Sequence, residues 1–183
     1  RVRVAAVRAL GPHRSAEDAV VRRLAADRWP LVRAAALEAL ARPEAGPAAR
    51  SAIVRAVEDR SWSVRVSAIR ALGPTGVRDA DARVLARLRD ARETSEVRRA
   101  AVELIESRCW RSARAALLAV LRERPETLSD EWVSLGVSAW RALHRLGPSS
   151  ELREAEGFGR GLPADLQREV RRARPCVPRE SRT

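Results

Sequence analysis

The sequence predicts an all-α protein built from stacked helical hairpins. A nine-residue pattern that begins Val-Arg in every copy occurs four times, and successive copies begin 30, 32 and 33 residues apart. No part of this region alternates between apolar and polar residues with a period of two, so no sheet is expected. The copies are VRVAAVRAL from Val2, VRAAALEAL from Val32, VRVSAIRAL from Val64 and VRRAAVELI from Val97.

Each copy of this nonapeptide carries apolar or small residues at its first, fourth, fifth, eighth and ninth positions. In the second copy these are Val32, Ala35, Ala36, Ala39 and Leu40. The spacing forms one stripe on a helix with 3.6 residues per turn. Alanine in the middle of the stripe permits close approach of a neighbouring helix, and the larger ends fill the remaining volume. Each nonapeptide is therefore expected to be a helix packed between others.

A second amphipathic segment lies between successive copies, at about 15–26, 47–57 and 80–89. Glycine and proline follow the nonapeptides, as in Gly11-Pro12 and Gly73-Pro74, where they are typical of a helix end. Each unit is thus expected to be a helical hairpin.

An acidic residue precedes three of the copies, in the turn before Val-Arg. This order, with an alanine-rich helix after it, resembles HEAT repeats, in particular the short bacterial type related to phycobilin-lyase repeats, over residues 1–107. The resemblance implies a right-handed superhelical solenoid with the nonapeptide helices on its concave face. It also implies a ladder of hydrogen-bonded pairs along the turns, formed by Asp27 with Arg33, Asp59 with Arg65 and Asp90 with Arg98. The third pair departs from the pattern, because two additional residues separate its members.

The predicted domain organisation follows the decay of the repeat. Residues 1–107 are HEAT-like repeats, of which the first lacks its partner helix, so the sequence is expected to be part of a longer protein. Residues 108–148 form a degenerate repeat, 149–173 form capping helices and 174–183 form a disordered tail. The glycine-rich segment 157–161 is expected to be a flexible connection before the last capping helix.

The net charge of +12 raises the alternative of nucleic-acid binding through a basic concave face, related to alkylation-repair repeats. All 36 basic residues are arginine, which indicates a partly compositional origin in a GC-rich genome. Arg8, Arg70 and Arg99 are the candidate contacts on that face. Trp29 and Trp62 occupy nearly equivalent turns, where they could stack on bases or, as we prefer, cover the ends of the helix layers with the indole N–H on a turn carbonyl.

The sequence favours a noncatalytic protein–protein interaction scaffold, a HEAT-repeat module of a larger bacterial protein whose unidentified partner binds the concave face. A bilin lyase-type chaperone is suggested only by the relatives of the repeat. Cys109 and Cys176 are 67 residues apart and match no metal or redox motif, and neither histidine belongs to a catalytic motif. No metal, no cofactor and no membrane contact are expected, and the cytoplasm is the expected compartment.

Overall fold

The computed structural model describes residues 2–10, 17–123 and 129–176. These residues form eleven α-helices and one short 3-10 helix, and no strand occurs among them. The expected all-α class is confirmed. Within the same residues, no helix combines the length and apolar character needed to cross a bilayer.

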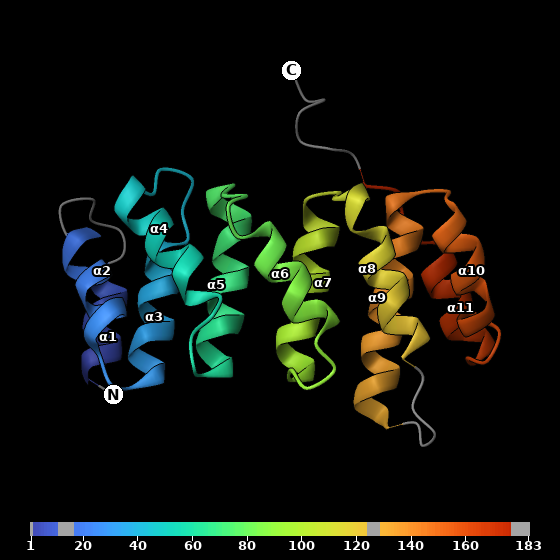
Figure 1. Ribbon diagram of the computed structural model, residues 1–183, viewed down its shortest axis with the longest axis horizontal. Helices are drawn as coiled ribbons and strands as arrows, with labels where there is room; N and C mark the ends of the chain where they lie inside the picture. Colours follow the sequence, from blue (N-terminus) through green and yellow to red (C-terminus); the bar gives the residue numbers. More distant parts are fainter. Residues whose placement is uncertain (1, 11–16, 124–128, 177–183) are drawn as a thin grey trace. The chain divides into compact units, whose positions relative to one another are not determined.

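The chain divides into two compact units, residues 1–84 and 85–183, each described here by itself. This division falls within a helix rather than after residue 107. In unit 1 the nonapeptide helices α1, α3 and α5 pack side by side in one layer, and α2 packs against α4 in a second layer (Figure 1). The helices of unit 1 are α1 (Val2–Leu10), α2 (Glu17–Ala26), α3 (Pro30–Leu40), α4 (Pro47–Ala56) and α5 (Trp62–Thr75).

The core of unit 1 includes much of the stripe read from the sequence and extends beyond it, to the sixth position of the nonapeptide and to α4. Leu37, Ile53 and Ile69 are completely buried, and so are the small residues Ala36 and Ala68 between the layers. Small side chains let the helix backbones approach one another, and the larger ones fill the volume that remains. The hairpins therefore bury their apolar stripes against one another.

The end of α5 differs from the sequence expectation. Gly73-Pro74 was expected to end this helix, but α5 continues to Thr75 and ends at Gly76, whose φ of 68° lies in the left-handed region. Pro74 has no N–H to donate to the Arg70 carbonyl oxygen, so α5 continues past it with one backbone hydrogen bond fewer, while the Thr75 hydroxyl donates to the Ala71 carbonyl oxygen at 2.9 Å. Gly76 is thus the helix-ending residue.

Unit 2 is centred on α9. Helices α7, α8, α10 and α11 all pack against this helix. Its elements are α7 (Ser95–Ser107), the 3-10 helix η2 (Arg111–Ala113), α8 (Arg114–Arg122), α9 (Asp130–Leu146), α10 (Ser150–Gly159) and α11 (Ala164–Arg171); α6 (Asp81–Arg89) spans the division between the units.

Aromatic rings close the core of unit 2. Trp140 is completely buried, and its ring lies edge-on to those of His144 and Phe158, at centroid distances of 5.1 and 6.3 Å. A Cβ atom added at Gly159 would lie 2.3 Å from Trp140 Cζ2, so only glycine fits beside the indole. The expectation of a flexible connection at 157–161 is therefore wrong for its first three residues, which end α10, and two of them, Phe158 and Gly159, pack on α9.

The expected disordered tail from residue 174 needs correction at its start. Arg174 to Cys176 are among the described residues, and the Cys176 N–H donates to the Arg145 carbonyl oxygen at 2.8 Å. Cys176 also forms a disulfide with Cys109, with 5.6 Å between their Cα atoms. These three residues are thus attached to unit 2, and 177–183 lie outside the described residues.

Candidate functional site

The turns before three nonapeptide helices share one hydrogen bond. Asp27, Asp59 and Asp90 each accept the backbone N–H two residues further along, at 2.8 to 2.9 Å. Such a bond from an aspartate side chain to its own turn fixes the backbone where one helix ends and the next begins. The aspartates are therefore part of the turn itself.

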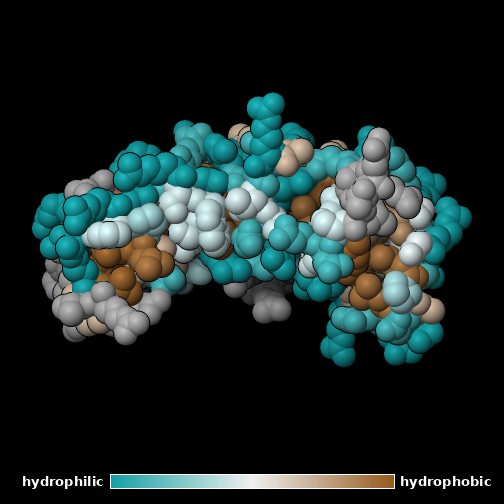
Figure 2. Space-filling model, turned by 90° about the horizontal axis from the view of Figure 1, so that it is seen from below, coloured by the Kyte–Doolittle hydropathy of each residue, from teal (hydrophilic) through white to brown (hydrophobic). Residues whose placement is uncertain are grey.

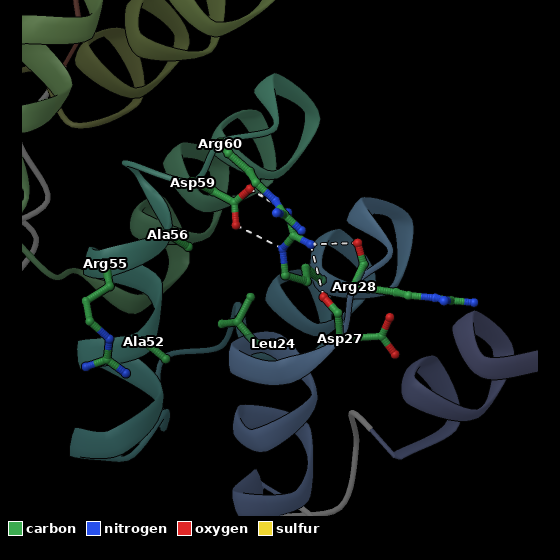
Figure 3. A pocket seen from close by; sticks show the side chains of 9 residues that line it. Leu24, Asp27, Arg28, Ala52, Arg55, Ala56, Asp59 and Arg60 are labelled. Atoms are coloured by element: carbon green, nitrogen blue, oxygen red, sulfur yellow. Dashed lines mark hydrogen bonds and ion pairs between the residues drawn. The ribbon is translucent and has the colours of Figure 1, made fainter.

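Arg33 connects two successive turns of unit 1. Its Nε and Nη2 atoms donate to the two carboxylate oxygens of Asp59, at 2.9 and 2.7 Å. Its Nη1 atom donates to the carbonyl oxygens of Asp27 and Arg28, at 3.0 and 3.2 Å, as the dashed lines in Figure 3 show. With the Arg33 side chain 6 % exposed, this is a nearly buried, bidentate ion pair that also satisfies the carbonyl groups of a helix end.

The pairing register differs from the one that the resemblance implied. Arg33 contacts the backbone of its own turn, at Asp27, and the carboxylate of the following turn, at Asp59. Arg3 repeats this arrangement with the Asp27 carboxylate at 3.5 Å, and Arg65 donates to the Asp59 carbonyl oxygen at 2.8 Å. The carboxylates of Asp27 and Asp59 therefore each have two kinds of partner, which are the N–H within their own turn and the arginine of the preceding repeat.

The carboxylates of both turns have lowered pKa values. The N–H of Trp29 is the largest cause for the pKa of Asp27, with Arg3 adding a smaller contribution. Burial raises the pKa of Asp59, but the hydrogen bonds from Arg33 and from the Ser61 N–H together outweigh it. Both groups are therefore ionised at neutral pH and are acceptors only.

In unit 2 the equivalent arginine has a different set of partners. Arg98 donates through Nε to the Leu88 carbonyl oxygen at 2.9 Å and pairs through Nη2 with Glu123 at 2.5 Å. The Asp90 carboxylate, expected to be its partner, instead accepts from the Arg92 N–H. Glu123 was missed in the sequence, although it follows Arg98 by 25 residues, much as Asp59 follows Arg33 by 26. This similar spacing was the feature of the sequence from which the Arg98–Glu123 pair could have been predicted.

The large apolar side chains exposed at the surface gather at two turns of unit 1. Trp29, Leu31 and Trp62 are 52, 71 and 48 % exposed. The Arg28 guanidinium lies 5.0 Å from the Trp29 ring centroid, which is a cation–π contact. Beside this pair a hollow of about 330 Å³ is lined by Arg3, Val4 and residues 29–32. Figure 2 shows a hydrophobic area over unit 1 at the ends of α1 and α3.

A second hollow in unit 1, of about 520 Å³, lies between the α2–α3 and α4–α5 turns (Figure 3). Leu24, Ala52 and Ala56 form its apolar part, and all three are buried. The remaining lining is charged and consists of Asp27, Asp59, Arg28, Arg33, Arg55 and Arg60.

The other candidate residues lie apart from these hollows. Arg70 is exposed on α5 of unit 1, whereas Arg99 is partly buried on α7 of unit 2. Arg8 belongs to α1, and its side chain lies outside the described part of the structure. Among the described residues, no three histidine, cysteine, aspartate or glutamate side chains are grouped as metal ligands would be.

The chain was compared with known protein families, and the result agrees with the observed stack of helical hairpins. The family described as HEAT repeats matches residues 19–106, which contain α3 to α6 and most of α2 and α7. These residues belong to the HEAT-repeat family. Both hollows and all three exposed apolar side chains are formed within or directly beside these HEAT repeats. A search of curated proteins returned no significant match.

Proposed function

We propose that this chain is a noncatalytic scaffold that binds another protein through the turns of unit 1. HEAT repeats generally serve as protein-interaction scaffolds. The observation that supports this surface is the exposure of Trp29, Leu31 and Trp62, each about half exposed or more, at two successive turns. Tryptophan and arginine are the residues most enriched among those that dominate binding energy at protein interfaces. We call the surface of Arg28, Trp29, Leu31, Arg60 and Trp62 the turn edge.

The turn edge replaces the concave face as our proposed partner site. Arg70 and Arg99, the described candidates for that face, belong to different units, and neither accompanies an exposed large apolar side chain. Exposed or partly exposed arginines are ordinary on a chain with 36 of them, whereas exposed tryptophans at consecutive turns are not. The exposed apolar side chains of the turn edge therefore indicate a partner site more specifically than the arginines of the concave face do.

The protein-binding proposal is tested with a variant of the turn edge. The expected result is that Trp29→Ser/Trp62→Ser loses partners that the wild-type chain retains from an extract of its native cells, with an unchanged circular dichroism spectrum. Arg22→Ser/Arg70→Ser, which changes two exposed residues elsewhere in unit 1, serves as the control and should retain them. Retention of the same partners by the tryptophan variant would contradict the proposal.

Nucleic-acid binding is the alternative outcome, and salt dependence separates it from protein binding. We expect fluorescent duplex DNA and single-stranded RNA to bind only at low salt, because a chain with a charge of +12 releases counterions from any polyanion. Submicromolar binding at physiological salt, lost in Arg70→Ala/Arg99→Ala, would favour the nucleic-acid function instead.

The proposed setting is a larger bacterial protein in the cytoplasm, and the disulfide provides a test of the compartment. Cytoplasmic thiols are kept reduced, so stable disulfides are rare there. If the cytoplasmic setting is correct, rapid alkylation of intact cells should label both Cys109 and Cys176, and the disulfide should form only after lysis. Cysteines that are already paired in the cell would place the protein in an oxidising compartment.

A further inference from the structure

The arginine-lined hollow of unit 1 has an excess of positive charge. Its lining contains four guanidinium groups and two carboxylates, which leaves a formal charge of +2. Both carboxylates are already engaged, Asp59 by the fork of Arg33 and Asp27 by the Trp29 N–H and by Arg3. The hollow therefore offers unmatched positive charge to a ligand.

The four arginines do not have the same role. Arg33 is nearly buried and its donors are used by the two turns, so it is structural. Arg55 and Arg60 are exposed, and neither forms an ion pair with a carboxylate of the described residues, although the charge of Arg60 is one cause of the lowered pKa of Asp59. Arg55 donates to the Ser51 hydroxyl at 2.7 Å, a neutral partner that leaves its charge unbalanced. Arg55 and Arg60 are thus the groups available to an anion.

The positions of these side chains define a site with two walls. Arg55 extends from α4 beside Ala52, and Arg60 lies on the opposite side, next to Asp59 (Figure 3). The buried side chains of Leu24, Ala52 and Ala56 form the apolar surface between them. An anion placed there would meet guanidinium donors against a surface of low polarity, where a charge-assisted hydrogen bond is stronger than in open water.

The arginine hollow adjoins the apolar one. Arg28 lines the arginine hollow, yet its guanidinium stacks on Trp29, which lines the neighbouring hollow together with Leu31. In Figure 3 the Arg28 side chain extends away from Asp59, so it borders the anion site rather than filling it. One short segment of chain can therefore place an acidic side chain in one hollow and an apolar side chain in the other.

We propose that the turn edge, together with Arg55 of the adjoining hollow, recognises an acidic–apolar peptide segment of the partner protein, with its carboxylate in the hollow lined by Arg55 and Arg60 and its apolar side chain against Trp29 and Leu31. This inference rests on the proposed protein-binding function and specifies the chemistry of the partner. A guanidinium group can donate paired hydrogen bonds to either a carboxylate or a phosphate. A phosphorylated side chain could therefore bind in the same way as an acidic one, and the test below distinguishes the two. A peptide fits better than a nucleic acid, because the guanidinium groups of the arginine-lined hollow lie beside apolar side chains of both hollows, which a peptide side chain can contact and a phosphate backbone cannot.

The test uses random peptides displayed on phage and the full chain as bait. The wild-type chain is expected to enrich peptides in which aspartate or glutamate neighbours an apolar residue. The best of these, made with a fluorescent label, should bind Arg55→Gln/Arg60→Gln about tenfold more weakly, the loss expected for charge-assisted contacts. Replacing its acidic residue with the uncharged amide should cause a similar loss. Arg22→Gln/Arg70→Gln removes the same charge elsewhere in unit 1 and should bind normally.

Failure of this inference can be separated from failure of the proposed function. Enriched peptides without an acidic residue, or equal binding by Arg55→Gln/Arg60→Gln, would overturn the inference, while loss of partners in the tryptophan variant would still support a protein scaffold. A phosphoserine peptide that binds when its glutamate counterpart does not would also overturn the carboxylate assignment. Enrichment of no peptide by the wild-type chain would count against the inference whatever partners the extract supplies.

Discussion

The two units use the same residue type in opposite ways. In unit 1, Trp29 and Trp62 begin nonapeptide helices and remain about half exposed, whereas in unit 2 Trp140 is completely buried against Gly159 and Phe158. The difference comes from the neighbouring elements, because α10 and α11 cover α9 in unit 2 while the α2–α3 and α4–α5 turns lie at the surface. Trp140 therefore completes the core of unit 2, whereas Trp29 and Trp62 of unit 1 are available to a partner.

The largest expected effect comes from truncating the tryptophans themselves. Trp140→Ala should lower the free energy of unfolding by about 3–5 kcal/mol, because it removes a fully buried ring and leaves a cavity. Trp29→Ala should cost less than about 1 kcal/mol, as expected of a surface residue. Urea denaturation followed by circular dichroism measures both, and equal losses in the two variants would abolish the contrast between the units.

The connection between turns gives the next largest effect. Asp59→Ala leaves the Arg33 guanidinium nearly buried without its carboxylate, and we expect a loss of about 3 kcal/mol. Glu58→Ala, at the same turn, removes only an exposed pair with Arg83 at 3.4 Å and should change stability by less than about 1 kcal/mol. If Asp59→Ala unfolds at the same urea concentration as Glu58→Ala, the pair with Arg33 does not hold the hairpins together.

A smaller effect tests the close packing of unit 2. Gly159→Ala would bring a methyl group against Trp140 and should cost about 2 kcal/mol through overpacking. Gly157→Ala, in the same helix, meets no atom closer than 3.9 Å and should be neutral or stabilise the helix by about 0.5–1 kcal/mol. The midpoints of thermal unfolding should therefore move in opposite directions or differ clearly, and identical midpoints would show that α10 does not pack on Trp140 in this way.

The smallest expected effect is a pH dependence in unit 2. Burial lowers the pKa of His144 and outweighs the opposing effect of Glu156, whose Oε1 lies 2.9 Å from Nε2. The folded protein thus binds this proton more weakly than the unfolded chain, so stability falls as the pH decreases through about 6.5, the unfolded value, toward the lower pKa of the folded state. His144→Gln should lack this component. The lowered carboxylate pKa values of unit 1 act only in more acidic solution, and a wild-type stability that is flat in this range would contradict the assignment.

Much of the fold could be predicted from the sequence because the same helical pattern of apolar residues occurs in four copies. The stripe of Val32, Ala35, Ala36, Ala39 and Leu40 predicted a packed helix, and the structure buries all of these residues except Ala39, which is partly exposed. The end of α5 was misjudged because Pro74 removes only one backbone hydrogen bond of the last turn, and the left-handed residue that ends the helix is Gly76. A Gly-Pro pattern does not say which nearby glycine adopts that conformation.

The site was less accessible to sequence reasoning. Trp29 and Trp62 were identified as candidates, but their exposure depends on which elements cover the turns. The partner of Arg98 was missed because Glu123 comes from a different helical pair and is a glutamate where an aspartate was expected. The hollow around Arg55 and Arg60 needed the structure, because side chains from two hairpins meet there and neither residue belongs to the repeated nonapeptide.

The most direct test of the central claim is oxidative footprinting of the five tryptophans with and without a captured partner. In the free protein Trp29 and Trp62 should react readily and Trp140 slowly, in line with their exposure. In the complex, Trp29 and Trp62 should become protected while the reactivity of Trp140 stays the same. Unchanged reactivity of Trp29 and Trp62, with protection confined to tryptophans of unit 2, would show that the partner binds elsewhere.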